Sequence, residues 1–115
     1  MPTATTTRLL LRAEPGGVRW TVVAANGRVL GMAFSPVLDQ RAARTDFLAL
    51  CPRLARLPVT FGRENRSREW TWRVGDQESG HLARSAGSYE RHATARAAFA
   101  RFVTAATELC AAGSS

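Results

Sequence analysis

Four residues in this sequence carry side chains that often do covalent or metal chemistry: Cys51, Cys110, His81 and His92. The cysteines lack the C-x-x-C spacing of zinc and redox sites, so we expect two buried thiols. Neither histidine has a serine, cysteine or carboxylate arranged around it as nucleophile, base and orienting group. We therefore predict solvated histidines, no catalytic or metal-binding residue, no cofactor, and a protein that is not an enzyme.

Arginine is the residue whose abundance points to a partner. All 16 basic residues among the 115 of the chain are arginines, and the formal net charge is +7. Clustered cations bind nucleic acid because each phosphate contact releases counterions. Arginine without lysine, in an alanine-rich chain, is also typical of a GC-rich genome. The charge therefore leaves two explanations open, one functional and one compositional.

The elements that would position these side chains include a hairpin in the segment WTVVAANGRVLGMAFSP, residues 20–36. Asn26 and Gly27 are typical of a two-residue type I′ turn, in which both residues take positive φ. Such a turn fixes which residues of the two strands face each other. Trp20 and Val22 then share one face of the hairpin, which we call the inner face, and the residues between them point to the outer face.

A second copy of this pattern follows 52 positions later: Trp20 of the first copy corresponds to Trp72 of the second, and 72 minus 20 is 52. The matched pairs include strand and helix positions alike: Trp20 and Trp72, Val22 and Val74, Leu30 and Leu82, Arg44 and Arg96, and Phe47 and Phe99. We therefore predict one domain, residues 8–111, made of two repeats at about 8–57 and 58–111. Residues 1–7 are expected to be a disordered tail, and residues 112–115 are expected to form a short C-terminal tail.

Each repeat offers three short strands and a helix. Besides the hairpin strands, RLLLRA at 8–13 and PVTFGR at 58–63 are predicted as strands. Asp39 is the expected N-cap of the first helix, and Ser88 is the expected N-cap of the second. Both helices carry one apolar stripe, which must be buried on a sheet, and the inner face with its tryptophans is the natural partner.

Two short motifs carry a family resemblance: Ala25-Asn26-Gly27 in the turn, and Ala42-Ala43 at the start of the first helix. With the strands around them, they resemble the YegP-like family of small bacterial domains of unknown function. The resemblance implies an α+β fold in which two tandem β-β-β-α repeats share one mainly antiparallel sheet, with two helices on one face. It also implies that the strand after each helix crosses to the other repeat. It brings neither catalytic residues nor a substrate.

Apolar side chains gather on the predicted outer face of the first hairpin: Val23, Leu30, Met32 and Phe34. If helices cover only the inner face, these four lie exposed, and monomeric proteins rarely leave such a patch open. The simplest occupant is a second copy of the chain across a two-fold axis. We therefore predict a homodimer, with arginines around the apolar interface.

Arginines gather on the outer face of the second hairpin. The 52-residue offset places Arg73 opposite Arg84, and like charges in that position destabilise a sheet unless something neutralises them. Either Glu64, Glu69 and Asp76 neutralise them within the protein, or a polyanion binds there. The candidate polyanion site has these members: Arg19, Arg63, Arg66, Arg68, Arg73 and Arg84.

Two functions from different classes follow from this face. The first is a small interaction module that associates with itself, and the alternative is a protein that binds single-stranded nucleic acid. Phe34 is the only aromatic residue predicted on the outer face, which is less than most base-stacking surfaces offer. No apolar run approaches the ~20 residues that cross a bilayer, and the N-terminus has no signal or transit pattern. We therefore expect a cytoplasmic protein without a membrane partner.

Overall fold

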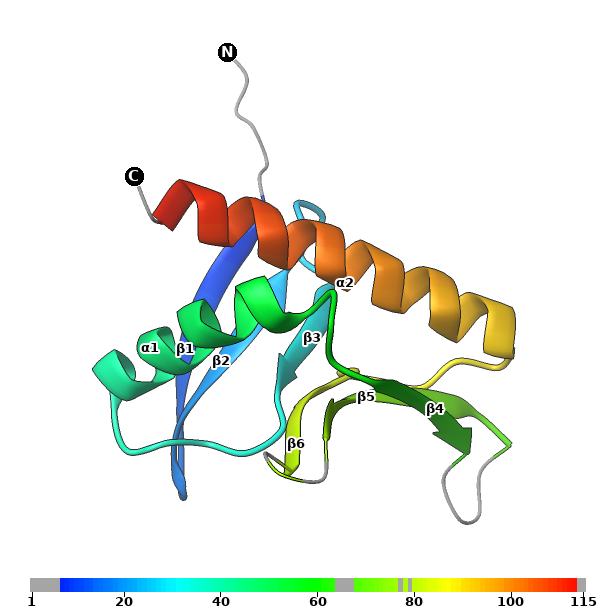
Figure 1. Ribbon diagram of the computed structural model, residues 1–115, viewed down its shortest axis with the longest axis horizontal. Helices are drawn as coiled ribbons and strands as arrows, with labels where there is room; N and C mark the ends of the chain where they lie inside the picture. Colours follow the sequence, from blue (N-terminus) through cyan, green and yellow to red (C-terminus); the bar gives the residue numbers. More distant parts are fainter. Residues whose placement is uncertain (1–6, 64–67, 77, 79, 114–115) are drawn as a thin grey trace.

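The structure, a computed structural model, describes residues 7–63, 68–76, 78 and 80–113. Strands in this part of the chain form one six-stranded antiparallel sheet, and two α-helices pack against it (Figure 1). The elements in chain order are β1 (Arg8–Glu14), β2 (Gly17–Val23), β3 (Val29–Ala33), α1 (Gln40–Leu50), the 3₁₀ helix η1 (Cys51–Arg53), β4 (Val59–Arg63), β5 (Trp70–Asp76), β6 (Gly80–Arg84) and α2 (His92–Gly113). The predicted α+β class is confirmed.

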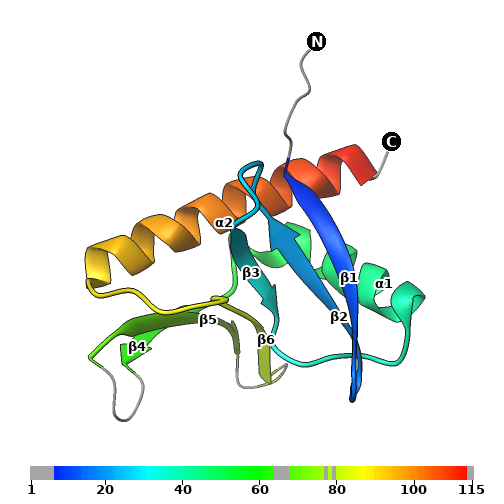
Figure 2. The ribbon, with the colours of Figure 1, turned by 180° about the vertical axis from the view of Figure 1, so that it is seen from behind.

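The order of strands across the sheet is β1-β2-β3-β6-β5-β4. Two antiparallel meanders, β1 to β3 and β4 to β6, meet in the middle, where Met32 pairs with Arg84 and Ala33 with Ala83. The strand after α1, β4, lies at one edge of the sheet and pairs with β5 (Figure 2). The implied crossing of this strand to the other repeat is therefore wrong, because the short connection from β4 to β5 favours pairing of strands adjacent in sequence.

Both helices lie on the inner face of the sheet, as expected (Figure 1). The centroid of the Trp20 ring on β2 is 5.2 Å from that of Phe47 in α1 and 6.2 Å from that of Phe102 in α2. Trp72 on β5 lies 4.9 Å from the same Phe102 ring. Both tryptophans are fully buried, at 0 % exposed. These rings join both helices and both meanders in one core.

The first hairpin turns differently from the prediction. Gly27 has a φ of +87°, but Asn26 is not at positive φ. The Gly27 N–H donates to the Ala24 carbonyl at 2.9 Å, and the Ala24 N–H donates to the Arg28 carbonyl at 2.8 Å. This pattern is a three-residue loop that ends with glycine in the left-handed position, so the predicted type I′ turn is wrong.

The longer loop shifts the register only beside the turn, since Thr21 pairs with Met32 and Val22 with Gly31, as a two-residue turn would also give. Beyond Val22 the pairing is irregular, and Val23 lies opposite Val29. The extra residue, Leu30, packs against the core on the inner side. The predicted place of Leu30 beside Val23 on the outer face is therefore wrong.

The second hairpin has the same irregularity at a distance of 52 positions. Its register shifts between Val74 and Gly75, as that of the first shifts between Val22 and Val23. The isolated bridges of the two halves follow the same spacing: Val18 with Val37, and Trp70 with Tyr89. The irregularity and the bridge thus occupy matching places in the two halves of the sheet.

The two helices begin differently. Asp39 caps α1, as predicted, because its side chain accepts a hydrogen bond from the Ala42 N–H at 2.8 Å. The prediction for Ser88 is wrong, since α2 begins only at His92. The Ser88 hydroxyl instead donates to the Glu69 carboxylate at 2.8 Å.

The C-terminal helix is longer than expected. It continues through Gly113, so residues 112 and 113, predicted as part of a tail, are helical. The rest of the predicted tails, at 1–6 and 114–115, lies outside the described residues. Over the part of the chain that the structure describes, neither helix combines the length and apolarity that a membrane span requires.

Candidate polyanion-binding face

The apolar patch predicted on the outer face does not assemble as expected. Val23 is 3 % exposed, beside Arg8 of β1, and Leu30 packs on the inner side. Of the four predicted interface residues, Met32 and Phe34 remain, half-buried, on the outer face. The register shift in the first hairpin is the reason, because it turns Leu30 inward.

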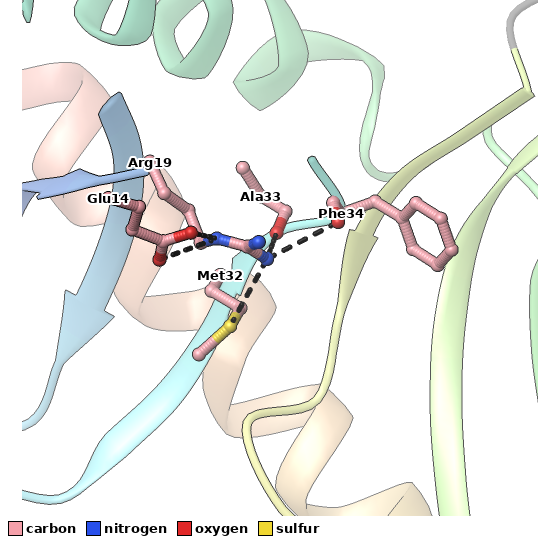
Figure 3. Close-up of polar contacts among 5 residues, drawn as sticks. All are labelled: Glu14, Arg19, Met32, Ala33 and Phe34. Carbon is pink, nitrogen blue, oxygen red and sulfur yellow. Dashed lines mark hydrogen bonds and ion pairs between the residues drawn. The ribbon is translucent and has the colours of Figure 1, made fainter. Parts of the chain in front are cut away.

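Arg19, a predicted member of the polyanion site, is occupied by contacts within the protein (Figure 3). Its Nε lies 3.1 Å from one carboxylate oxygen of Glu14 and 3.0 Å from the other. Its Nη1 donates to the carbonyls of Ala33 at 2.9 Å and Phe34 at 3.3 Å, and lies 3.7 Å from the Met32 sulfur. With a side chain 14 % exposed, Arg19 ties β1, β2 and the end of β3 together, which is a structural role.

Arg73 and Arg84 face each other across β5 and β6, as predicted. Both are exposed, and among the described residues neither side chain forms a hydrogen bond or an ion pair. The Arg73 guanidinium lies 5.9 Å from the centre of the Phe34 ring, and the His81 ring lies 4.8 Å from Phe34 between centroids. Two unpaired cations and two rings therefore share this part of the outer face.

Two hollows flank the arginine pair, and Arg73 lines both. The larger, of about 720 Å³, is also lined by Thr60 and His81. The smaller, of about 180 Å³, is lined by Arg84 and by residues 85–88, which lead from β6 toward α2. An extended ligand that contacts Arg73 would have room on either side of it.

The remaining arginines of the predicted cluster lie elsewhere. Arg63 stacks over the Trp70 ring at 4.9 Å, on the side of Phe61, which packs against the core. Arg68 is exposed just before β5, and Arg66 lies outside the described residues. Of the described members of the cluster, the structure pairs Arg73 with Arg84 across two strands, whereas Arg63 stacks on Trp70 and Arg19 contacts Glu14.

The acidic residues that offered an alternative partner for this pair are only partly described. Glu69 accepts a hydrogen bond from Ser88. Glu64 and the side chain of Asp76 lie outside what the structure describes. Among the described acidic residues, none forms an ion pair with Arg73 or Arg84.

Two arginines of the outer face were missed by the sequence-based prediction. Arg8 and Arg12 are exposed on β1, where Leu9 and Leu11 pack toward the core. Arg12 lies opposite Arg19 across β1 and β2, so a second arginine pair occurs on this face. The alternation of side chains in RLLLRA would have placed both arginines outward.

The Cys51 thiol is buried, and its Sγ lies 3.5 Å from the Ala106 carbonyl oxygen of α2. Burial, together with the neighbouring Cys110 thiol, raises the pKa of Cys51 to about 12. The Cys51 thiol therefore stays protonated near neutral pH and is a poor nucleophile.

Both histidines lie beside aromatic rings. His81 contacts Phe34 on the outer face, and His92 at the start of α2 lies 5.3 Å from Phe61 and 4.7 Å from Trp70 between ring centroids. Both side chains are exposed, as predicted. Each histidine thus has a packing contact in addition to its contact with solvent.

Comparison with known proteins bears on the fold. No protein-family model and no curated protein sequence matches this chain. A solved structure that does match is the solution NMR structure of YegP from E. coli, a protein of unknown function, with a TM-score of 0.67. The two chains share a fold. The match covers 92 % of this chain and 90 % of YegP at 12 % sequence identity, so structure alone supports the resemblance drawn from the hairpin.

Proposed function

We propose that this protein is a binding module without catalytic activity, whose outer face binds single-stranded nucleic acid as a polyanion. The proposal rests on one observation: Arg73 and Arg84 are exposed, directly opposed, and without an acidic partner among the described residues. Like charges in that position destabilise a sheet. A row of phosphates would neutralise them and would gain the free energy of counterion release.

The surroundings of the arginine pair are suited to phosphates and bases together. Phe34 and His81 present rings beside Arg73, and stacking on a ring contributes about 1–3 kcal/mol per base. Arg8 and Arg12 extend the positive charge of the same face to its edge at β1. At about 4.8 Å between strands, the distance from β1 to β5 is roughly 19 Å, so a ligand that reaches both groups of arginines must be extended.

Anisotropy of a fluorescent oligothymidylate, titrated at several salt concentrations, tests the proposal. Arg73→Ala with Arg84→Ala should weaken binding at least about tenfold and lower the salt slope by about 1.4, at roughly 0.7 for each phosphate contact. The melting temperature should stay the same or rise, because a repulsion is removed.

The matched control is Arg41→Ala with Arg44→Ala, which removes the same charge from exposed positions of α1. This control should keep most of the affinity. Equal weakening in the two double variants would show a nonspecific effect of net charge and contradict the proposal. Absence of binding by the unmodified protein at low salt would contradict it as well.

We further propose that the chain is a tandem pair of β-β-β-α repeats that occupy the single sheet side by side. The matching irregularities after Val22 and Val74 support this, and so do the matching bridges of the two halves. The order of elements, with three strands before each helix, supports it too. On this view the two repeats have diverged in their surfaces more than in their cores.

Self-association is the second candidate function. Met32 and Phe34 are half-buried on the outer face, and the outer edges of β1 and β4 end the sheet, so either could meet a second copy. Light scattering would give the mass in solution, and charged residues in place of Met32 and Phe34 should yield monomers if the face is the interface. The cytoplasmic location stays a prediction from the sequence.

A further inference from the structure

Another arginine-lined pocket lies beside α2. Its walls come from the loop between β2 and β3, from the segment between β6 and α2, and from α2 itself. Its volume of about 580 Å³ lies within the range of small-molecule sites. Each of the three segments contributes one arginine: Arg28, Arg91 and Arg101.

The arginines of this pocket form no ion pair among the described residues. None of the three arginines forms a side-chain hydrogen bond or ion pair there, and Glu90 is the acidic residue in the wall. Burial raises the pKa of Tyr89, while Arg101 and Arg28 act to lower it. Arg28 and Arg101 therefore both act on the Tyr89 hydroxyl, which lies in the wall between them.

The other half of the molecule offers an internal comparison. The bridge between Trp70 and Tyr89, which fixes one wall of the pocket, matches the bridge between Val18 and Val37. The residues 52 positions away from the polar residues of the pocket are apolar, small or acidic: Val37 for Tyr89, Asp39 for Arg91, Ala42 for Thr94, Ala49 for Arg101 and Gly80 for Arg28. The fold therefore does not by itself require cations at this place.

We propose that this pocket is a binding site for a phosphate group. Guanidinium groups match phosphate oxygens with two parallel hydrogen bonds, and the hydroxyls of Tyr89 and Thr94 add donors. The pocket is larger than a phosphate, so the group belongs to a larger molecule such as a nucleotide. This inference does not depend on nucleic-acid binding at the outer face.

The phosphate has two possible sources. Gly87 and Ser88 line this pocket and also the smaller hollow beside Arg84. A single strand bound at Arg84 could therefore place its terminal phosphate here, and a free nucleotide could place the same group here. The chemistry of recognition is the same in both cases.

Titration with inorganic pyrophosphate, followed by amide chemical shifts of the ¹⁵N-labelled protein, tests the site with phosphate alone. Shift changes should concentrate at residue 28 and residues 87–94. Arg91→Ala with Arg101→Ala should weaken pyrophosphate binding at least about tenfold, because charge-assisted hydrogen bonds are lost. Arg44→Ala with Arg96→Ala, the matched control at exposed helix positions outside the pocket, should change the affinity less than about twofold.

The substituted arginines are exposed, so circular dichroism should show an unchanged fold. The proposal is wrong if pyrophosphate binding weakens equally in the Arg91→Ala, Arg101→Ala variant and in the Arg44→Ala, Arg96→Ala control. It is also wrong if the chemical-shift changes are spread over all surface arginines. The Arg73→Ala, Arg84→Ala variant separates this site from the outer face and should bind pyrophosphate like the unmodified protein. Loss of pyrophosphate binding in that variant would contradict the proposal that the pocket is a site separate from the outer face.

Two further ligands identify the source of the phosphate. If a 5′-phosphorylated oligothymidylate binds more tightly than its 5′-hydroxyl form, and this difference vanishes in the Arg91→Ala, Arg101→Ala variant, the phosphate is the end of a strand. If the two oligonucleotides bind alike but adenosine monophosphate competes with pyrophosphate, the source is a free nucleotide. If Arg91→Ala with Arg101→Ala changes the affinity for neither the 5′-phosphorylated oligothymidylate nor adenosine monophosphate, the proposal is wrong.

Discussion

Two buried tryptophans in matching places show how a single residue changes the core. The Trp20 Nε1 donates to the Asp46 carboxylate at 2.8 Å, whereas the Trp72 Nε1 is buried without a partner among the described residues. The position 52 residues after Asp46 is Ala98, which is buried and has no acceptor to offer. A buried donor without an acceptor costs free energy, so the two indoles, which pack on the same Phe102, stabilise the fold unequally.

Asp46→Ala should leave Trp20 in the same state as Trp72. The substitution removes the acceptor of a fully buried N–H, and we expect the free energy of unfolding to fall by about 1–3 kcal/mol in equilibrium urea unfolding. Asp46→Asn is the control, since its amide oxygen can still accept the hydrogen bond, and it should cost clearly less. If both substitutions cost the same, the hydrogen bond is not the cause.

At the scale of elements, the sequence predicts what alternation and helical spacing determine. Strands expected at 8–13 and 58–63 are found at Arg8–Glu14 and Val59–Arg63, and Asp39 caps its helix. The pairing of Arg73 with Arg84 was predictable because this pair lies in the regular part of its hairpin, farther from the turn than the register shift. The irregularity itself was not, since Asn-Gly is compatible with a two-residue or a three-residue loop, and the loop length decides which faces Val29 and Leu30 take beside the turn.

Gly31→Ala should reveal how closely α2 approaches the sheet. A Cβ on Gly31 of β3 would lie 2.6 Å from Phe102 Cδ1 and 2.8 Å from Trp72 Cη2, so the rings must move, and we expect a loss of about 1–3 kcal/mol in the free energy of unfolding. Gly62→Ala in β4 is the matched control, because a Cβ there meets no atom within 4 Å. The control should be neutral or stabilising, since alanine loses less conformational entropy. Equal costs at the two positions would rule out a steric cause.

At the scale of the molecule, α2 holds the two meanders together. It contacts β2 and β3 of one meander and β4 and β5 of the other. The same packing limits what can be predicted about sites. Arginines of one hairpin can be paired from the sequence, whereas Arg28, Arg91 and Arg101 come from three segments that meet only through the path of α2 across the sheet. That path depends on tertiary contacts, which short-range patterns do not contain.

Neither meander with its own helix should fold alone. Fragment 1–57 lacks α2, so Trp20 would lose the stacked Phe102 ring and β3 would lose its pairing with β6. Units of about fifty residues bury too little surface to be more than marginally stable even with a complete core.

We expect fragments 1–57 and 58–115 to show no cooperative thermal transition by far-ultraviolet circular dichroism. The intact chain should unfold in one transition, with the same midpoint by circular dichroism and by tryptophan fluorescence, because both indoles report on one shared core. A cooperative transition in either fragment, or separate midpoints in the intact chain, would mean that the halves are independent units and that Phe102 does not couple them.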